Sequence, residues 1–365
     1  MPELLKSPLY ERQVALGARF AEFGGWSMPL QYSGIVAEHR SCRESVAIFD
    51  VSHLGKVSVK GPAAVDFLNA CLSNDLNRIA AGKAQYTLAC NESGGVVDDL
   101  IAYRISDDDV FLIPNASNTA SVVELLLAAA PSGIEIENLH RAYAVIAVQG
   151  RYSDEVLAAL GLPVGHDYMS FQLAKFGGTE LTVCRTGYTG ERGYELVVSS
   201  DAAGLVWDEV LAAGSEYDIV PAGLGARDTL RTEMGYPLHG HELTPSISPI
   251  EGSVAWAVGW KKDRFWGSAA LKAERANGAK RLLRGLSAIG KGIPRPGMNV
   301  VSAEGEPLGV VTSGTFSPSL NKGIALALLD APCPASGKAG VEIRGRVEEF
   351  EIVDTPFLAP NVRES

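Results

Sequence analysis

Short runs of alternating apolar and polar residues fill much of residues 1–275, and segments with helical spacing of apolar residues separate them. Alternation with a period of two predicts strands, whereas apolar residues three and four positions apart predict amphipathic helices. We expect strands over residues 54–60, 85–90, 96–105, 109–114, 143–149, 180–185 and 194–198. We expect helices over residues 34–48, 63–72, 117–130, 202–214 and 223–235. Strands and helices mixed in this order predict an α+β fold with antiparallel sheets.

The pattern changes after Gly278, where short alternating stretches follow one another between Gly and Pro turns. This pattern is typical of a small all-β barrel or jelly roll. The chain is also too long for a single hydrophobic core. We therefore predict one region over residues 1–277, built as two interleaved α+β lobes, and a C-terminal β-barrel domain over residues 278–365.

Composition narrows the possible functions. The net charge of -11 argues against a general nucleic-acid binder. No apolar run reaches the roughly eighteen residues of a membrane-spanning helix, and residues 1–6 lack the apolar core of a signal peptide. We therefore expect a cytoplasmic protein without a membrane partner. The five cysteines are scattered without a CxxC pair, so the sequence predicts neither a disulfide framework nor a metal site.

Positive charge is concentrated in one segment. Residues 255–300 contain ten Lys and Arg residues, opposed only by Asp263 and Glu274. Such a patch on an acidic protein suits an acidic partner or an anionic ligand tail. A solvated helix and linker would show the same pattern, and both interpretations stay open.

Two adjacent carboxylates are the most informative feature of the chain. Asp98 and Asp99 interrupt an apolar strand that follows a turn at Gly94 and Gly95. Successive side chains of a strand point to opposite faces, so the two carboxylates cannot share a face. One can enter a pocket, as a proton handler or an ammonium anchor, while the other stays in solvent or caps a backbone group. The alternative is the solvated edge of an ordinary hairpin.

This segment and four others carry a resemblance to a known family. The five segments, in order, are residues 49–53 (FDVSH), 96–101 (VVDDLI), 185–196 (RTGYTGERGYEL), 223–235 (GLGARDTLRTEMG) and 312–319 (TSGTFSPS). In order and spacing they resemble the aminomethyltransferase, or T-protein, family of the glycine cleavage system. The resemblance runs nearly end to end.

The resemblance implies an activity and a shape. Members of the family move the methylene carbon of an aminomethyl group, carried on the lipoyl arm of H-protein, to tetrahydrofolate. The products are 5,10-methylenetetrahydrofolate, ammonia and dihydrolipoyl H-protein. Members look like a cloverleaf of three lobes with folate in the central hole, and the last lobe is a β-barrel.

The resemblance also implies roles for individual residues. Asp98 matches the essential Asp, and a carboxylate beside the reacting carbon would stabilise positive charge and steer protons; Asp99 is then the outward-facing neighbour. Glu195 matches the pterin-binding acid, because a carboxylate accepts two N–H donors of an aminopyrimidine. Arg227 matches a folate-contacting residue, and Arg231 is expected in a structural ion pair. The positions expected to line the folate slot are Tyr86, Tyr103, Asn115 and Tyr188.

The resemblance bears on two further positions. His53 resembles a family position in the strand that enters the site, and we expect a structural role for it. The C-terminal segment 356–363 lacks the Tyr that ends the family's pattern. Arg363 is therefore the candidate for contacting the glutamate tail of folate.

Two other functions fit the same fold. A folate-dependent demethylase acting on dimethylsulfoniopropionate has the same length, although the basic segment at 255–300 favours a protein partner. A non-enzymatic folate-binding protein of iron–sulfur maturation is marked by a Lys-Gly-Cys motif, which this chain lacks.

Overall fold

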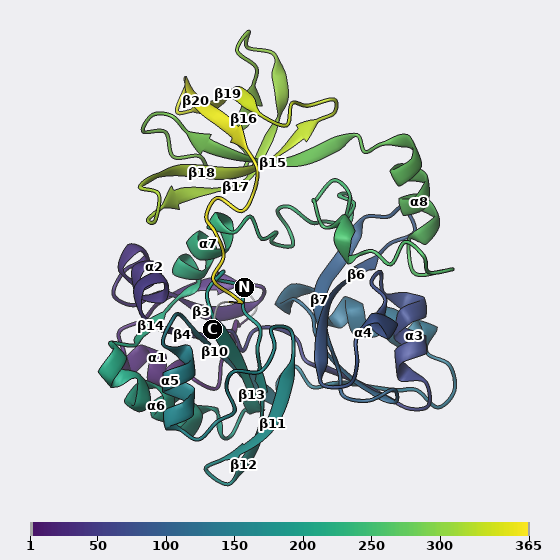
Figure 1. The fold of residues 1–365 in the computed structure, drawn as a ribbon, viewed down its shortest axis with the longest axis vertical. Coiled ribbons are helices and arrows are strands. Elements are labelled where there is room, and N and C mark those ends of the chain that lie inside the picture. The colour runs from purple at the N-terminus through teal and green to yellow at the C-terminus, as the bar shows by residue number, and fades with distance from the viewer. Residues whose placement is uncertain (1–2, 364–365) are drawn as a thin grey trace.

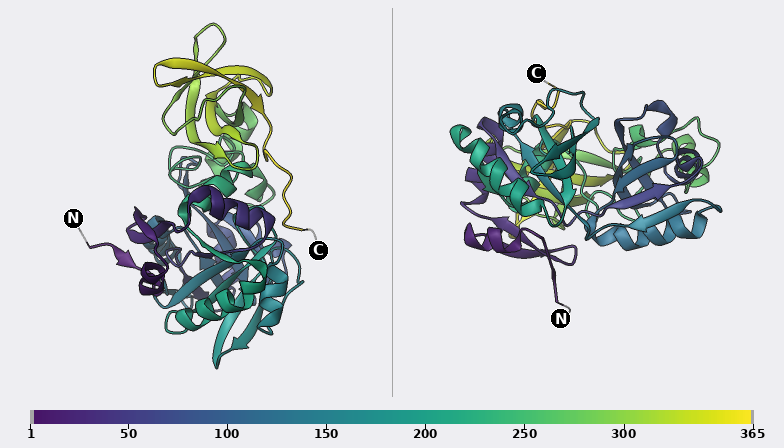
Figure 2. Two further views of the ribbon diagram at one scale, coloured as in Figure 1. Left: turned by 90° about the vertical axis from the view of Figure 1, so that its left-hand side faces the viewer. Right: turned by 90° about the horizontal axis from the view of Figure 1, so that it is seen from below.

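The computed structural model describes residues 3–363, which form three bodies: two α+β lobes and a C-terminal barrel (Figure 1). The predicted α+β fold with a closed barrel is confirmed. Seen from below, the two lobes lie side by side and the barrel lies behind them (Figure 2). No helix within residues 3–363 combines the length and the apolar character needed to cross a membrane.

The first lobe is a five-stranded antiparallel sheet in the order β6-β7-β8-β5-β9. Its strands are β5 (Val57–Lys60), β6 (Lys83–Cys90), β7 (Val96–Arg104), β8 (Asp109–Ile113) and β9 (Glu135–Asn138). Helices α3 (Ala64–Cys71) and α4 (Thr119–Ala129) cover one face, where Leu68 and Leu126 pack on Leu100 and Ala102 of β7. The other face of β7, with Ile101 and Tyr103, turns toward the second lobe.

The second lobe is a six-stranded sheet in the order β11-β12-β13-β10-β4-β14, in which only the β4–β14 pair is parallel. Its strands are β4 (Ala47–Asp50), β10 (Tyr143–Gln149), β11 (Phe171–Phe176), β12 (Thr179–Cys184), β13 (Gly193–Ser199) and β14 (Val220–Ala222). Helices α5 (Ser153–Ala159) and α6 (Ala203–Ala213) bury one face around Trp207. The opposite face packs on α2 (Ile35–Glu44) and α7 (Leu224–Glu233).

A shared core joins the two lobes. Ala84 and Tyr103 of the first sheet pack in one cluster with Val145 and Val197 of the second and with Leu230 of α7. Because this cluster is buried, the relative position of the lobes is fixed by apolar packing. A small N-terminal sheet, with the order β1-β3-β2, completes this part of the molecule. Its elements are β1 (Leu5–Lys6), α1 (Tyr10–Ala15), β2 (Arg19–Phe23) and β3 (Trp26–Gln31).

The C-terminal body is a closed six-stranded barrel around Phe350 and Leu286. Its strands are β15 (Arg281–Ala288), β16 (Asn299–Val301), β17 (Pro307–Ser317), β18 (Lys322–Asp330), β19 (Gly337–Ile343) and β20 (Arg346–Val353). Closure pairs every strand on both sides and so removes exposed sheet edges. Helix α8 (Ser268–Asn277) precedes it, and we propose to keep the domain boundary at residues 277 and 278, in the turn between α8 and β15. Short 3-10 turns are η1 (Leu76–Arg78), η2 (Ala116–Asn118), η3 (Gly214–Tyr217) and η4 (Ala255–Ala257).

Two predicted elements differ from the structure, and several were missed. The helix expected over residues 34–48 ends at Glu44, and the chain continues as β4, whose four residues are all buried. The strand expected over residues 54–60 begins at Val57. Missed altogether are the N-terminal elements and β9, β11, β14, α5 and α8.

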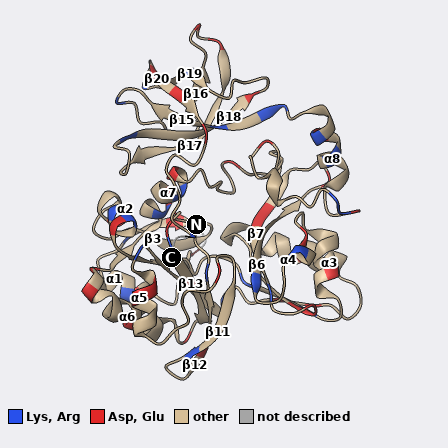
Figure 3. Cartoon of the chain, in the orientation of Figure 1, with Lys and Arg blue, Asp and Glu red and all other residues tan. Residues whose placement is uncertain are grey.

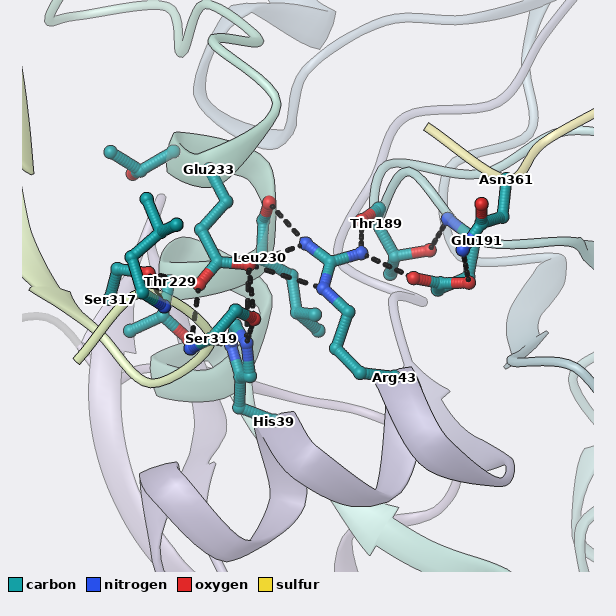
Figure 4. Close-up of polar contacts among 12 residues, drawn as sticks. His39, Arg43, Thr189, Glu191, Thr229, Leu230, Glu233, Ser317, Ser319 and Asn361 are labelled. Carbon is teal, nitrogen blue, oxygen red and sulfur yellow. Dashed lines mark hydrogen bonds and ion pairs between the residues drawn. The ribbon is translucent and has the colours of Figure 1, made fainter. Parts of the chain in front are cut away.

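A buried polar cluster joins the barrel to the lobes, and we call it the Glu233 cluster: His39, Arg43, Glu191, Glu233, Ser317, Ser319 and Asn361 (Figure 4). Glu233 at the end of α7 accepts hydrogen bonds from Arg43 (2.8 Å), from Ser319 Oγ (2.9 Å) and from Ser317 Oγ. Arg43 Nη1 donates to Glu191 (2.8 Å), and Glu191 also accepts a hydrogen bond from Asn361 (3.1 Å). One carboxylate thus holds α2, α7 and the β17–β18 loop together.

Figure 3 shows Lys and Arg residues on α8, within the basic segment at 255–300, and several basic side chains of this segment make structural contacts. Arg281 pairs with Glu251 (2.9 Å), and Lys262 Nζ donates to the carbonyls of Leu72 (2.6 Å) and Asn74 (2.7 Å). Lys272 likewise donates to backbone carbonyls. These contacts give part of the patch a structural role.

Candidate functional site

A cavity of about 870 Å³ lies where the three bodies meet. Both sheets contribute to its wall, as do the segment after α7, the barrel and the C-terminal tail. Seven of the eight predicted site residues line it: Tyr86, Tyr103, Asn115, Tyr188, Glu195, Arg227 and Arg363. The eighth, Asp98, does not line it.

The two neighbouring carboxylates point to opposite faces of β7, as predicted, but the assignment of the faces was wrong. Asp99 lines the cavity, whereas Asp98 is fully buried on the side covered by α3 and α4. Asp98 shares its face with Leu100 and Ala102, while Asp99 shares its face with Ile101 and Tyr103. Both faces of β7 are covered, so period-two alternation separates the carboxylates without showing which one meets the cavity.

One amide links the two carboxylates. Asn115 Nδ2 lies 2.9 Å from Asp98 Oδ1, Asp99 Oδ1 and the Asp99 carbonyl. Tyr86 donates its hydroxyl proton to Asp99 Oδ2 at 2.9 Å. Burial raises the pKa of both carboxyl groups, and the charge of Asp99 raises the pKa of Asp98 further. A pair of this kind takes up or releases protons closer to neutral pH than an isolated Asp does.

Glu195 lies at the opposite lobe in a polar chain that crosses the lobe boundary. Thr186 donates its hydroxyl proton to Glu195 Oε2 at 2.5 Å, and the Tyr103 and Thr186 hydroxyls are 3.3 Å apart. Glu195 is 8% exposed yet borders the cavity. A carboxylate held in this way presents its remaining acceptor sites to N–H donors in the cavity.

Arg227 lies over the ring of Tyr188, with 4.6 Å between the guanidinium carbon and the ring centroid. Within residues 3–363 the structure gives this guanidinium no hydrogen bond or ion pair. Burial lowers the pKa of Arg227, although a guanidinium remains charged. A half-buried cation that borders a cavity and has no ion pair within the described residues is suited to an anionic or carbonyl-bearing ligand. Arg231, by contrast, pairs with Glu242 (3.1 Å) and Asp228 (2.8 Å).

Two further positions considered from the sequence, Arg363 and His53, also border the cavity. Arg363 belongs to the C-terminal tail and lies 5.8 Å from the ring centroid of Tyr168. The tail is held to the second lobe, because Asn361 N donates to the carbonyl of Gly190 at 2.7 Å. His53 is buried and borders the cavity, and burial lowers its pKa well below the usual value.

Several cavity residues were missed by sequence reasoning. His239 lies in the segment after α7, which carries no regular pattern, and contacts the carboxylate pair through Asn118. Trp256 stacks on Tyr86, with 5.3 Å between ring centroids, and is 65% exposed. A Trp this exposed is an unusual surface residue, but only the structure shows that it borders the site. Residues 3–363 contain no cluster of three or more His, Cys, Asp and Glu side chains suited to a metal ion.

Comparisons with known proteins identify the family of the chain. The family model described as "GCVT N-terminal domain" matches residues 9–262, and "Glycine cleavage T-protein C-terminal barrel domain" matches residues 281–358. A relative from Mycobacterium bovis named aminomethyltransferase is 58% identical over 100% of this chain and 99% of its own length. One of the same name from Frankia alni is 55% identical over the full length of both.

A solved structure shows the same fold. The glycine cleavage system aminomethyltransferase T from Bartonella henselae is 32% identical to this chain, with a TM-score of 0.93 over 99% of this chain and 100% of its own. The sequence matches and the shared three-body architecture lead to one conclusion: the chain belongs to the glycine cleavage T-protein family.

Proposed function

We infer that the chain performs the aminomethyl transfer of the glycine cleavage system inside the central cavity, with lipoylated H-protein as donor and tetrahydrofolate as acceptor. The observation that carries this is the composition of the cavity wall. It places the Asp99 carboxylate, the Glu195 carboxylate and the unpaired Arg227 guanidinium around one space large enough for a folate-sized ligand.

The reaction exchanges the bonds of one carbon atom. The C–N and C–S bonds of the aminomethyl group break, and two new C–N bonds form to N5 and N10 of tetrahydrofolate. The two protons lost from N5 and N10 end on ammonia and on the dihydrolipoyl sulfur. Asp99 is the group placed to stabilise the cationic methylene carbon and to carry protons between these atoms, because it borders the cavity and its pKa is raised.

The other cavity residues bind and orient. Glu195 accepts N–H donors from the aminopyrimidine edge of the pterin, and Tyr103 borders the same part of the cavity. Arg227 and Tyr188 meet the polar or anionic part of folate, and Arg363 lies at the rim where the glutamate tail leaves. Asn115 is a less direct contact than the family resemblance implied, since its amide is already bonded to both Asp residues.

One assay tests this proposal. Aminomethylated H-protein and tetrahydrofolate are mixed with the chain, and ammonia and 5,10-methylenetetrahydrofolate are measured. We expect equal amounts of the two products. Methyl transfer from dimethylsulfoniopropionate without these products would assign the chain to the demethylases instead.

Replacing Glu195 tests pterin binding. We expect Glu195→Gln to weaken tetrahydrofolate binding by about 10- to 100-fold, because a neutral amide replaces a charged acceptor. Calorimetric titration measures the dissociation constant. The control is Glu180→Gln at an exposed position of β12, which should bind as the unaltered chain does. Equal affinity in both variants would contradict the assignment.

Replacing Arg227 tests the second binding contact. We expect Arg227→Met to weaken folate binding by about 10-fold or more, since it removes a charged donor from the cavity. Arg227→Lys keeps the charge and should lose less. Arg346→Met, at the exposed start of β20, is the matched control. If Arg227→Met binds folate normally, this residue serves only to pack against Tyr188.

A further inference from the structure

Asp98, behind the cavity wall, is surrounded by N–H donors. Its Oδ1 accepts from Asn118 Nδ2 (2.7 Å) and Asn115 Nδ2 (2.9 Å), and its Oδ2 accepts from the Asn115 backbone N–H (3.1 Å). Each partner that the structure gives Asp98 within residues 3–363 is a donor. A proton on this carboxyl group would therefore have no acceptor, and these contacts favour the anion against burial and the charge of Asp99, which raise the pKa of Asp98.

The same Asn118 amide also contacts a ring nitrogen of His239 and determines whether that nitrogen donates or accepts. The amide has two hydrogens, and Nδ2 lies 2.7 Å from Asp98 Oδ1 and 3.0 Å from His239 Nδ1. The amide oxygen points elsewhere, where it accepts from Ser117 Oγ at 3.2 Å. His239 Nδ1 must therefore act as an acceptor, and its Nε2 donates to the Val96 carbonyl at 3.1 Å. The tautomer of His239 is set by these two contacts.

The Asn118 amide could turn over only if both His239 Nδ1 and Asp98 carried a proton. If His239 Nδ1 were protonated, the Asn118 amide would have to turn its oxygen toward it, and the same oxygen would face Asp98. Asp98 would then need a proton to donate. Through a single amide, the anionic form of Asp98 is thus linked to the unprotonated Nδ1 of His239.

We propose that Asn118 and His239 are positioning residues that hold Asp98 as a buried anion directly behind Asp99 and so set the protonation of the cavity-facing acid. The consequence for Asp99 rests on the proposed function. A fixed negative charge on the neighbouring residue makes Asp99 a better proton acceptor than an isolated carboxylate. The other titratable groups around the pair are Tyr86 from β6 and Tyr188 from the segment before β13, and both are expected to stay protonated at neutral pH because burial raises their pKa.

Three variants test the proposal in the full chain. Asn118→Leu removes the donor to Asp98, and His239→Phe removes the acceptor that orients Asn118. Both changes weaken the donor contacts that favour the Asp98 anion, so Asp98 takes up a proton at a higher pH and Asp99 loses its charged neighbour. Activity depends on the Asp98 anion, and we therefore expect the acidic limb of the kcat–pH profile to move upward by about one pH unit in both. The KM for tetrahydrofolate should change less than about threefold. His239→Gln can accept from Asn118 and donate to Val96, so its profile should match that of the unaltered chain. Asn77→Leu, at an exposed position, is the matched control.

Two results would overturn the proposal: unmoved profiles in Asn118→Leu and His239→Phe, or a His239→Gln profile displaced as far as that of His239→Phe. A second measurement needs neither activity nor a folded variant. Nitrogen NMR of the unaltered chain labelled at histidine should show His239 with an unprotonated Nδ1 and a protonated Nε2 at neutral pH. The opposite tautomer contradicts the proposal. An inactive but well-folded chain with the expected tautomer would refute the proposed function alone.

Discussion

Asp99→Asn is expected to lower kcat for methylene transfer by a factor of about 10² to 10⁴. The amide can still accept a hydrogen bond from Tyr86, but it can neither carry a negative charge nor exchange a proton at this position. Folate affinity should change little, because Glu195 and Arg227 are left in place. Initial rates of ammonia release and the tetrahydrofolate dissociation constant, measured side by side, separate the two effects.

The variant Asp98→Asn is the most informative comparison for Asp99→Asn. Asp98→Asn would place an amide N–H among the donors of Asn115 and Asn118, so we expect it to reduce the stability of the first lobe. Asp66→Asn, on the exposed face of α3, controls for removal of a carboxylate as such. If Asp99→Asn retained more than about a tenth of the activity, Asp99 could not be the proton carrier at the reacting carbon.

Glu233→Ala is expected to lower the free energy of unfolding by about 3–5 kcal/mol. Glu233 is fully buried, and its removal leaves Arg43 beside a single carboxylate, Glu191, while Ser317 and Ser319 lose their acceptor. Urea unfolding followed by circular dichroism measures the loss. Glu209→Ala, on the exposed side of α6, should cost less than about 0.5 kcal/mol. Equal costs would contradict a central role for the cluster.

The same cluster predicts a dependence of stability on pH. The contacts of Glu233 with His39, Ser317 and Arg43 outweigh burial and lower its pKa to about 2, from an ordinary value of 4.5. Because the folded-state pKa lies below the unfolded one, this stabilisation is complete above pH 4.5 and is lost as the pH falls toward 2. The difference is on the order of 3 kcal/mol. Glu233→Ala should therefore show a weaker loss of stability between pH 4.5 and 2 than the unaltered chain.

Elements with a clear period were predictable from the sequence. The strand expected over residues 143–149 matches β10, and the alternating stretches after Gly278 form the closed barrel. The error at residues 45–48 has a physical cause, since a short run that is apolar on both sides has no helical or strand period. In the N-terminal sheet, β1 was missed because it spans only two residues.

The site was predictable in its residue types but not in its geometry. Tyr103, Thr186 and Glu195 meet only because the two sheets share a core, and no local pattern contains that contact. The face of Asp98 could not be read from alternation, because helices cover one side of β7 and the cavity lies on the other. His239 comes from an irregular segment whose path depends on packing between α7 and the first lobe.

The most direct test of the account is a crystal structure of the chain with tetrahydrofolate bound. We predict that the pterin edge lies against Glu195, and that an Asp99 carboxylate oxygen is within hydrogen-bonding distance of a folate nitrogen that receives the methylene carbon. A folate bound outside the cavity, or one in the cavity with Asp99 turned away from it, would contradict the account.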